Sequence, residues 1–538
     1  MHRPTQAINL FATYQAGILR KTDKGMFLPS KKILVVLPSP LMARNFLRTQ
    51  ALLMLRQQLG AHVTVVSPNP DDRGVVQEIG ATWLPYFHPR RWAGAASLAA
   101  LQIPPSPPFL KGGTNAILSP PSLPPLEKGG RGGFEKAANA PSPQVGRSRR
   151  LTWYLRYLAG LALHMSLTYR LNSMCHFSGF AARLRQSWPL RKIYLREGLP
   201  MSRVFGFPWP RSSLVYRWLY RLYYSRWQTF EPVNSLVAQL KPDLVVLGMI
   251  QTHMVTPYAL AARLAGIPIL GINGSWDQPT TKGPVCPDIK RIVVQNDIVL
   301  EQLVRYHSIA KERIAVIGWL QMDAYAQGAT VAHEDLFNRI GIAPGNRYIL
   351  FAANAPRLGK HEPALVLALA KQIQAGALGD DVMLLCRCHP QDTQWQARWG
   401  WAAHLPGVVV EPPELGALDH LAALIRSAAV VIASAGSINL DAIALDTPTI
   451  GLAWEEPTLP YWDQPARAYD QEHLTGLRSS SGMAFARNHT ELILACKRYL
   501  DSRTADSSGR AHLRERYLYR LDGGAAARLV NKVRSMLA

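Results

Sequence analysis

Short runs of consecutive apolar residues alternate along most of this chain with longer segments whose apolar residues recur at helical spacing. The first run, ILVVLP at residues 33–38, is followed by helical spacing over residues 43–59, which ends at Gly60, and by a second run at residues 62–66. Apolar runs of this length are typical of buried strands. A strand, a helix and a strand joined by short turns form the unit of parallel α/β sheets. The pattern therefore predicts a Rossmann-like domain near the start of the chain.

The same alternation resumes at residue 241 and continues to the end of the sequence. Predicted strands lie in KPDLVVLGMI, IPILGING, RIVVQND and RIAVIG, and beyond residue 345 in YILFAAN, VMLLCRCHP, VVVEPP, VVIASAG and PTIGLAW. At 538 residues the chain is long enough for several domains. We predict an α/β fold of two Rossmann-like, doubly wound parallel-sheet domains that face a cleft, residues 31–325 and 326–538, after a leader of residues 1–30.

Two segments interrupt this pattern within the first domain. Residues 102–150 are rich in proline and glycine and contain the similar sequences PPSPPFLKGG and PPSLPPLEKGG. Such a composition buries too little apolar surface to offset the entropy of folding, so we predict a disordered insertion. A proline-rich docking segment is the alternative. We predict that residues 151–230, which follow, form basic helices rich in aromatic residues.

The net charge of +24 narrows the possible partners, because a basic surface attracts nucleic acid, anionic membranes or phosphorylated substrates. Residues 147–227 contain 15 lysines and arginines and a single acid, Glu197, so they account for 14 of these charges. Arginines interleaved with aromatic residues favour a helix that lies in the headgroup layer of an anionic membrane. The alternative is a packed core with a solvated arginine face. No recognised nucleic-acid-binding module accompanies the charge, so we expect no nucleic-acid partner.

The remaining composition indicates a globular protein of a reducing compartment. Hydrophobic residues make up 48% and charged residues 18% of the chain, close to the average of folded domains. Five scattered cysteines provide neither a disulfide framework nor a four-ligand zinc spacing. The first residues contain no apolar region of the signal-peptide type, and no 20-residue apolar run occurs. We therefore expect a cytoplasmic protein, peripheral on the inner membrane face if the basic segment binds there.

The segment at residues 429–453 carries the most informative motif. A predicted strand at residues 430–433 delivers Ser434, Gly436 and Ser437 to the start of a helix. Small residues at such a junction let an anionic ligand approach the free backbone N–H groups and the positive end of the helix dipole. The serine hydroxyls add further donors. The alternative is that this serine–glycine turn only caps the helix.

Two further side chains are predicted at the carboxyl edge of the same sheet, where open α/β folds bind ligands. They are Arg387 and His389, at the end of the segment MLLCRCHP. Alternation along a strand places these two on one side and Cys386 and Cys388 on the other. An arginine and a histidine on one side favour the binding of a diphosphate. The cysteines and His389 lack a fourth ligand and zinc spacing, so we predict no metal site.

The segment INGSWDQPTTKG at residues 272–283 offers a second group of polar residues, in the first domain. Asp277 lies where a carboxylate at the carboxyl end of a strand could act as general base for a hydroxyl nucleophile. Lys282 could steady a phosphate, and Trp276 and Thr281 are candidates for contacts with an acceptor or a phosphate. The alternative is that Asp277 forms an Asx turn without a chemical role.

The order of these motifs resembles that of the GT-B glycosyltransferase superfamily, and within it the bacterial branch near CDP-glycerol glycerophosphotransferases and surface-polysaccharide transferases. The resemblance rests on SWDQPTTKG, on Ile317-Gly318 with Asp323 five residues on, on RCHP and on ASAGSINLDAIALDTPTIGLA. It extends from about residue 32 to the C-terminus, without the insertion. It implies an N-terminal acceptor domain, a C-terminal nucleotide-donor domain, a cleft between them, and catalysis without a metal or another cofactor.

The resemblance also implies roles for single residues. Arg387 and His389 match the phosphate-contacting Arg/His-Pro motif, and the loop at residues 434–437 matches the turn that binds the donor phosphates. Asp441 stands where relatives often have a glutamate that holds a ribose or sugar hydroxyl, and its side chain is shorter. SWD occupies the place of the Trp-His-Gly motif of the glycerophosphotransferases, whose histidine is the base. Asp277 replaces this histidine, which favours sugar transfer over polyol-phosphate transfer.

The implied function is the transfer of a sugar, with inversion, from a nucleotide diphosphate sugar to a hydroxyl of a lipid-linked or polysaccharide acceptor at the inner membrane face. Such a reaction belongs to polysaccharide biosynthesis for the cell envelope. Asp277 would take the acceptor proton, while Arg387, His389 and the Ser434 loop would stabilise the departing diphosphate. Three alternatives stay open: a CDP-polyol phosphotransferase, a nucleotide-sugar epimerase and a non-catalytic membrane-associated scaffold.

Overall fold

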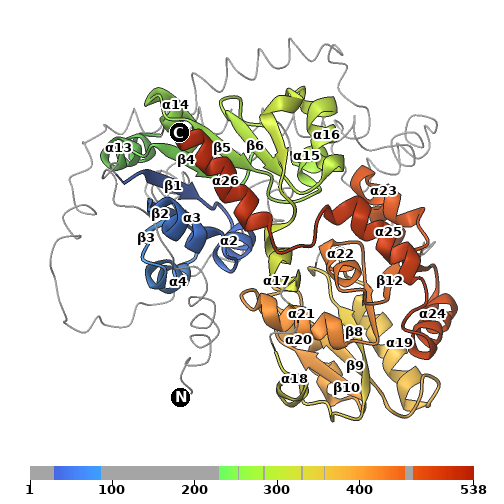
Figure 1. Ribbon diagram of the computed structural model, residues 1–538. Coiled ribbons are helices and arrows are strands. Elements are labelled where there is room, and N and C mark those ends of the chain that lie inside the picture. The colour runs from blue at the N-terminus through green and yellow to red at the C-terminus, as the bar shows by residue number, and fades with distance from the viewer. Residues whose placement is uncertain are drawn as a thin grey trace, which may run out of the picture.

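The computed structural model describes residues 30–86, 230–251, 254–282, 285–326, 328, 331–356, 358–454 and 464–538. Within these residues the chain forms two α/β domains, each built on one parallel sheet (Figure 1). The predicted fold class of two Rossmann-like domains is therefore confirmed. The predicted insertion lies outside the described residues, as do the leader and the basic aromatic segment apart from Ser30 and Phe230.

The first domain contains a seven-stranded sheet with the strand order β3-β2-β1-β4-β5-β6-β7. The direction of winding changes between β1 and β4, as in doubly wound folds, and ligands of such folds bind at the carboxyl ends of the strands beside this point. The strands are β1 (Lys32–Val36), β2 (His62–Ser67), β3 (Thr82–Pro85), β4 (Leu244–Leu247), β5 (Ile269–Ile272), β6 (Arg291–Val294) and β7 (Ile314–Val316).

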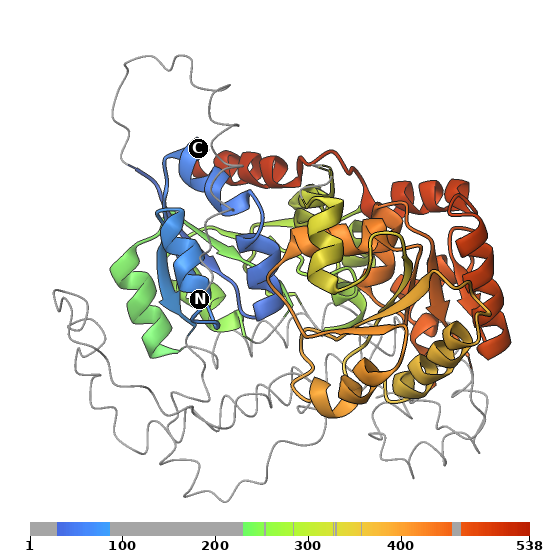
Figure 2. The ribbon, with the colours of Figure 1, turned by 90° about the horizontal axis from the view of Figure 1, so that it is seen from below.

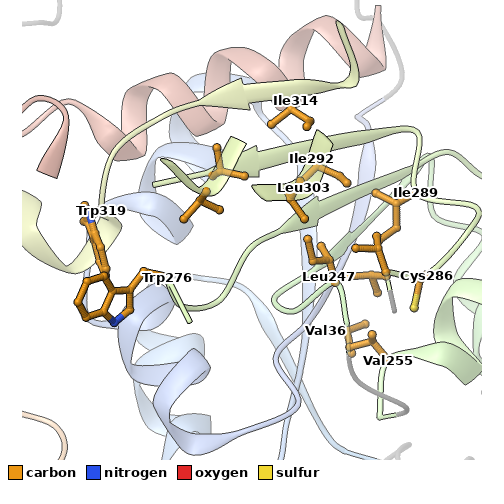
Figure 3. Close-up of a cluster of buried hydrophobic side chains, with 14 of the residues drawn as sticks. Val36, Leu247, Val255, Trp276, Cys286, Ile289, Ile292, Leu303, Ile314 and Trp319 are labelled. Atoms are coloured by element: carbon orange, nitrogen blue, oxygen red, sulfur yellow. The ribbon is translucent and has the colours of Figure 1, made fainter. Parts of the chain in front are cut away.

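Helices cover both faces of this sheet, because successive residues of a strand point to opposite sides. In β1, Ile33 and Val35 belong to one apolar cluster, and Leu34 and Val36 belong to another. Figure 3 shows part of the second cluster, which extends to the indole rings of Trp276 and Trp319. The helices are α2 (Pro40–Leu47), α3 (Ala51–Leu59), α4 (Asp72–Glu78), α13 (Glu231–Leu240), α14 (Thr256–Leu264), α15 (Gln278–Thr281), α16 (Asp297–His307), α17 (Asp323–Ala326) and the 3-10 helices η2 (Lys311–Arg313) and η3 (Leu320–Met322).

The predicted helix over residues 43–59 is two helices in the structure, α2 and α3. In the break between them, the Thr49 hydroxyl donates to the carbonyl of Phe46 at 2.9 Å and accepts from the Ala51 N–H at 3.4 Å. A threonine side chain that bonds the backbone in this way competes with the helical hydrogen bonds. The predicted helix end is confirmed, since Gly60 has a left-handed backbone with a φ of +57°.

The second domain repeats this design around a six-stranded sheet with the order β10-β9-β8-β11-β12-β13. Its strands are β8 (Arg347–Ala352), β9 (Val382–Arg387), β10 (Val408–Glu411), β11 (Val430–Ala433), β12 (Thr449–Leu452) and β13 (Ala484–Ala486). Its helices are α18 (His333–Ile340), α19 (Glu362–Gln374), α20 (Trp395–Trp399), η4 (Gly400–His404), α21 (Leu418–Ser427), α22 (Ser437–Ala444), η6 (Pro465–Asp470), α23 (Glu472–Arg478), α24 (His489–Asp501) and α25 (Ser507–Leu518).

The last helix, α26 (Ala525–Leu537), crosses back to the first domain, as Figure 2 shows. It packs against α3 and adds apolar side chains, among them Leu529, to the cluster that covers one face of β1. The N–H groups of Ala525 and Ala526 donate to the carboxylate of Asp323 at 3.0 and 2.8 Å. The division predicted from the sequence assigned residues 326–538 to the second domain, and the structure differs from it at this helix.

The two domains are in direct contact. One apolar cluster contains Trp276 and Trp319 of the first domain together with Leu477 and Tyr517 of the second. The Trp319 indole N–H donates to the Tyr517 carbonyl at 2.9 Å. The carboxyl ends of both sheets therefore lie near a packed interface, and polar residues at its edge can belong to a site that both domains share.

Candidate functional site

The loop between β11 and α22 leads from the end of a buried strand to a helix start without a side-chain cap. Ser434 follows β11 and is 8% exposed, and its hydroxyl donates to Oε1 of Glu362 at 2.8 Å. Gly436 has an extended backbone and makes no side-chain cap, and the exposed Ser437 begins α22. The first N–H groups of α22 therefore have no side-chain acceptor from the cap residue, and they carry the positive end of the helix dipole. The predicted alternative, a serine that caps the helix, does not describe this turn.

The shape of this loop depends on Asn439, which the sequence motif contains but which sequence reasoning did not single out. Asn439 is fully buried. Its Nδ2 donates to the Ser434 carbonyl at 3.2 Å, and its Oδ1 accepts from the Thr449 hydroxyl at 3.1 Å. The Asn439 side-chain amide thus links the loop to β12 and does not bond the first N–H groups of α22.

A buried ion pair, Glu362 with Arg398, joins the loops at the carboxyl edge of the second sheet. Glu362 is fully buried, and its Oε2 accepts from the Asn354 N–H at 2.9 Å and from Arg398 at 3.0 Å. Arg398 also donates to the Asn354 carbonyl at 2.7 Å and to Asp392 at 3.1 Å. Burial raises the pKa of Glu362, although these hydrogen bonds and the one from Ser434 oppose the shift. No sequence motif indicated either member of this pair.

Arg387 is the last residue of β9 and is 6% exposed. It pairs in register with Glu411, the last residue of β10, and its guanidinium forms an ion pair with that carboxylate. On the other side, Arg387 is level with Ala352 of β8, which is level with Ala433 of β11. Two strand spacings separate Arg387 from the end of β11, or about 10 Å. Both therefore lie on the same edge of the sheet.

Glu411 also belongs to a group of three side chains, with Glu414 and His420, whose potential metal ligand atoms lie within 4.8 Å of one another. His420 bonds the second carboxylate oxygen of Glu411, and Arg387 donates to the Glu414 carbonyl at 3.3 Å. Burial favours a protonated Glu411, but the hydrogen bond from His420 and the charge of Arg387 outweigh it and lower the pKa. A guanidinium already supplies the positive charge here, so we interpret the group as the support of Arg387.

His389 lies in a turn just beyond the end of β9, because the Asp392 N–H donates to the His389 carbonyl at 2.8 Å. The strand alternation that predicted it beside Arg387 ends at this turn. Its Nδ1 accepts from the Gln391 N–H at 3.1 Å, so the neutral ring carries its proton on Nε2, where it can donate. Burial lowers the pKa of His389, which favours this neutral form; Arg398 acts in the same direction and Asp392 opposes it. Cys386 and Cys388 lie in the core on the opposite face, as predicted.

Asp277 directly precedes α15 and is held by its neighbours. The Thr281 hydroxyl donates to its Oδ2 at 2.9 Å, and Nζ of Lys282 lies 3.9 Å from the same oxygen. The carboxylate makes no capping bond to the helix, so it does not form the predicted alternative, an Asx turn at this helix start. Burial alone would raise the pKa of Asp277, but Lys282, His473 and the hydrogen bonds to Asp277, including that of Thr281, outweigh it and lower the pKa.

His473 of α23 approaches this carboxylate from the second domain, and sequence reasoning missed it. Its ring lies 4.9 Å from the indole of Trp276, edge to face. Burial lowers the pKa of His473 to about 4, although Asp277 opposes the shift. Its Nδ1 has no hydrogen-bond partner among the described residues. Trp276 itself is 5% exposed and packs within the apolar cluster between the domains.

Asp441 faces the first domain from α22 and is 8% exposed. The Tyr325 hydroxyl donates to its Oδ1 at 3.1 Å. Burial raises the pKa of Asp441 to about 6, and the charge of Arg44 on α2 and the bond from Tyr325 oppose the shift. The structure therefore brings together Asp441, Tyr325 and Arg44 at the boundary between the domains. Asp277, Thr281 and Lys282 form a separate group around His473.

Comparison with known proteins agrees with this architecture. Residues 286–535 match the family described as CDP-glycerol:poly(glycerophosphate) glycerophosphotransferase. The matched region includes Arg387, His389 and the Ser434 loop, and it begins after Asp277. No curated protein sequence matches the chain.

Solved structures share the fold at low sequence identity. A protein of Listeria monocytogenes described as a UDP-N-acetylglucosamine 2-epimerase has a TM-score of 0.50 and 11% identity, and the match covers 94% of this chain and 97% of that chain. The UDP-GlcNAc 2-epimerase of Neisseria meningitidis, bound to UDP-GlcNAc, has a TM-score of 0.48 and 10% identity over 94% and 100%. A glycosyltransferase of Rickettsia africae has a TM-score of 0.46 and 10% identity over 95% and 99%. The Listeria match and the two parallel sheets show the GT-B fold, and residues 286–535 are similar to the CDP-glycerol glycerophosphotransferases, which confirms the resemblance predicted from the motifs.

Proposed function

We propose that this protein transfers a sugar from a nucleotide diphosphate sugar to a hydroxyl of a lipid-linked or polysaccharide acceptor. One observation carries the proposal: the start of α22 without a side-chain cap, Ser434 fixed by Glu362, and Arg387 share one edge of the second sheet. Hydrogen-bond donors and a guanidinium at this edge suit a diphosphate. The match of residues 286–535 to transferases of a nucleotide-activated group supports the same assignment.

In the proposed reaction the acceptor oxygen attacks the anomeric carbon, and the bond from that carbon to the diphosphate oxygen breaks with inversion. The acceptor proton moves to Asp277, whose carboxylate Thr281 and Lys282 hold in place. The charge that develops on the diphosphate is met by the N–H groups of α22, by Arg387 and by Nε2 of His389. Donors that are fixed before the reaction are worth a few kcal/mol of barrier each, about 3 in well-studied cases. Asp441 would hold a ribose or sugar hydroxyl.

Transfer of a polyol phosphate from a CDP-polyol is the second candidate, because the matched family carries that description. In this case the acceptor oxygen attacks the phosphorus that carries the polyol, the bond from that phosphorus to the bridging oxygen breaks, and CMP leaves, so the product contains the phosphate. In the sugar transfer the product contains no donor phosphate. Phosphorus analysis of the acceptor product therefore separates the two reactions.

The first test is a thermal-shift screen of the full-length protein with nucleotide diphosphate sugars and CDP-glycerol, because a ligand of the folded state stabilises it. Arg387→Ala and His389→Ala should reduce the shift and the turnover of the stabilising donor. Arg347→Ala is the matched control, since Arg347 forms an ion pair with Asp381 at the opposite edge of the same sheet. Donor turnover near the wild-type rate in both site variants would contradict the donor assignment.

Product analysis without an acceptor and the thermal-shift screen together separate the remaining alternatives. Release of an epimerised nucleotide sugar without an acceptor would favour an epimerase, and the lack of any nucleotide-dependent shift would favour a scaffold.

Binding to the inner membrane face is proposed for the arginines of residues 151–227, which lie outside the described residues. None of the described helices has the length and apolar character needed to cross a membrane. Reversal of these charges should abolish binding to anionic liposomes, and unchanged binding would rule this step out.

A further inference from the structure

A cavity opens in the first domain at the carboxyl ends of β1, β4, β5, β6 and β7, apart from the arginine and serine residues of the second domain. Its volume is about 30 Å³, room for two or three water molecules or one hydroxymethyl group. No charged side chain lines it. Its polar walls are the amides of Asn45, Asn273, Gln295 and Gln321, and its apolar walls include Phe46 and Leu320.

Asn273 gives this cavity an unused hydrogen-bond acceptor. The residue follows β5 and is fully buried. Its Nδ2 donates to the Ser275 carbonyl at 2.7 Å and to Oε1 of Gln295 at 2.8 Å, so both amide hydrogens are used. Its Oδ1 is buried and has no hydrogen-bond partner in the described part of the chain. Buried polar atoms are nearly always paired, so a ligand hydroxyl or an ordered water is the expected partner.

Gly274 follows Asn273 in the cavity wall and packs tightly against α2 and the end of β4. A Cβ atom there would lie 2.3 Å from Sδ of Met42 and 3.2 Å from the carbonyl oxygen of Gly248. Met42 and Gly248 also line the cavity. A side chain at this position would displace Met42 and crowd the Gly248 carbonyl, so glycine lets the loop after β5 approach α2 and β4 closely beside Asn273.

The cavity is connected to the donor side of the interface through α2. Oδ1 of Asn45 accepts two hydrogen bonds from its neighbour Arg44, at 3.0 and 2.8 Å. The charge of Arg44 in turn interacts with Asp441 and Arg387 of the second domain. Arg44 thus contacts a residue of the cavity wall, and its charge acts on residues assigned above to the donor.

We propose that this cavity binds an uncharged hydroxymethyl group of the acceptor, such as the end of a polyol or the primary alcohol of a sugar. The hydroxyl donates to Oδ1 of Asn273 and accepts from the side-chain amide of Gln321, and the carbon packs against the apolar wall. A phosphate or carboxylate would find no charged partner among the lining residues, so the site selects for a neutral group. This inference rests on the proposed transferase function, because it describes the acceptor of that reaction.

The experiment is a titration of the full-length protein with glycerol and with glycerol 3-phosphate, followed by saturation-transfer NMR. Asn273→Leu and Gln321→Leu remove polar groups from the cavity wall. Gln321 makes no hydrogen bond to the described residues, so its replacement keeps the test valid if Asn273→Leu fails to fold. Asn234→Leu on α13 is the matched control, because its Oδ1 is likewise buried without a described partner but does not line the cavity.

We expect glycerol to bind the wild-type protein and the control equally, and to bind both cavity variants about tenfold more weakly, the effect of one lost hydrogen bond. Equal binding by all four proteins, or no binding of glycerol to the wild type, would overturn the inference and leave water as the occupant. Stronger binding of glycerol 3-phosphate that depends on Asn273 would also overturn it. A nucleotide thermal shift measured in parallel tests the proposed function separately, because donor binding without polyol binding removes only the present inference.

Discussion

Tyr325 and Asp441 join the two domains through one hydrogen bond, which the tyrosine hydroxyl donates to Oδ1 of the carboxyl group at 3.1 Å. Tyr325 belongs to the short helix that ends the first domain, and Asp441 belongs to the helix whose start we assign to the donor phosphates. Any change in the charge of Asp441 therefore acts on the domain contact and on the donor site together.

This relationship predicts an unusual pH dependence of stability. Burial raises the pKa of Asp441 from 3.8 to about 6, so the folded protein binds this proton more tightly than the unfolded chain does. The resulting stabilisation is complete below about pH 4 and is lost as the pH rises through 6, a loss of roughly 3 kcal/mol. Asp441→Asn should remove this loss. Urea unfolding at pH 4.5 and 7.5 measures it, and an unchanged pH dependence in the variant would contradict the assignment.

Replacing Glu362 should weaken donor binding indirectly, because Glu362 positions Ser434 and does not itself contact the donor. Glu362→Gln removes the charge that pairs with Arg398 and weakens the hold on Ser434, at a cost of about 1–3 kcal/mol in stability. We expect KM for the donor to rise more than kcat falls. Glu491→Gln is the control, because its ion pair with Arg487 is on the surface and should contribute little. Donor KM values that match in the two variants would argue against this positioning role.

The identity of the general base can be read from the pH dependence of the rate. Asp277→Asn should lower kcat by about 10²–10⁴-fold if Asp277 is the base. The pKa of Asp277 is below its usual value of 3.8, so the rate should fall only below about pH 4. Thr281→Val removes a hydrogen bond that lowers this pKa and should move the acid limb to higher pH. A limb near pH 6 in the wild type would instead indicate Asp441, whose pKa is about 6.

The contact of α26 with the first domain should be essential for stability. Leu529 is fully buried in the cluster on β1, so Leu529→Ala should cost about 2–5 kcal/mol in the free energy of unfolding. Asp323→Ala removes the acceptor of two N–H groups at the start of α26 and should cost about 1–2 kcal/mol. Leu494→Ala is the control, because Leu494 is 60% exposed and should change little.

The fold could be predicted from the sequence because its strands are short apolar runs and its helices follow glycine or proline signals. The break at Thr49 could not be predicted, since it depends on which of two hydrogen-bonding patterns one side chain adopts. The crossing of α26 was also missed. The apolar spacing of α26 indicates that one face of the helix is buried. Which of the two sheets it covers depends on tertiary contacts, which the sequence pattern does not reveal.

Candidate site residues that lie at strand ends could be located from the sequence. Residues that tertiary contacts bring in from distant segments could not. Ser434, Gly436 and Arg387 lie at strand ends, so their position follows from the order of elements. Glu362 and His473 come from other segments of the chain and have no motif. The cavity beside Asn273 was missed for the same reason, because its walls come from α2, five strand ends and η3.

The position of α26 has a consequence for the order in which the protein matures. The ribosome makes this helix after every strand of the second domain, yet its apolar side chains complete the interior of the first. Part of one side of the earliest sheet therefore stays uncovered until α26 is made, and this part would be open to chaperones until then. Premature termination before α26 should then damage the half of the protein that was translated first.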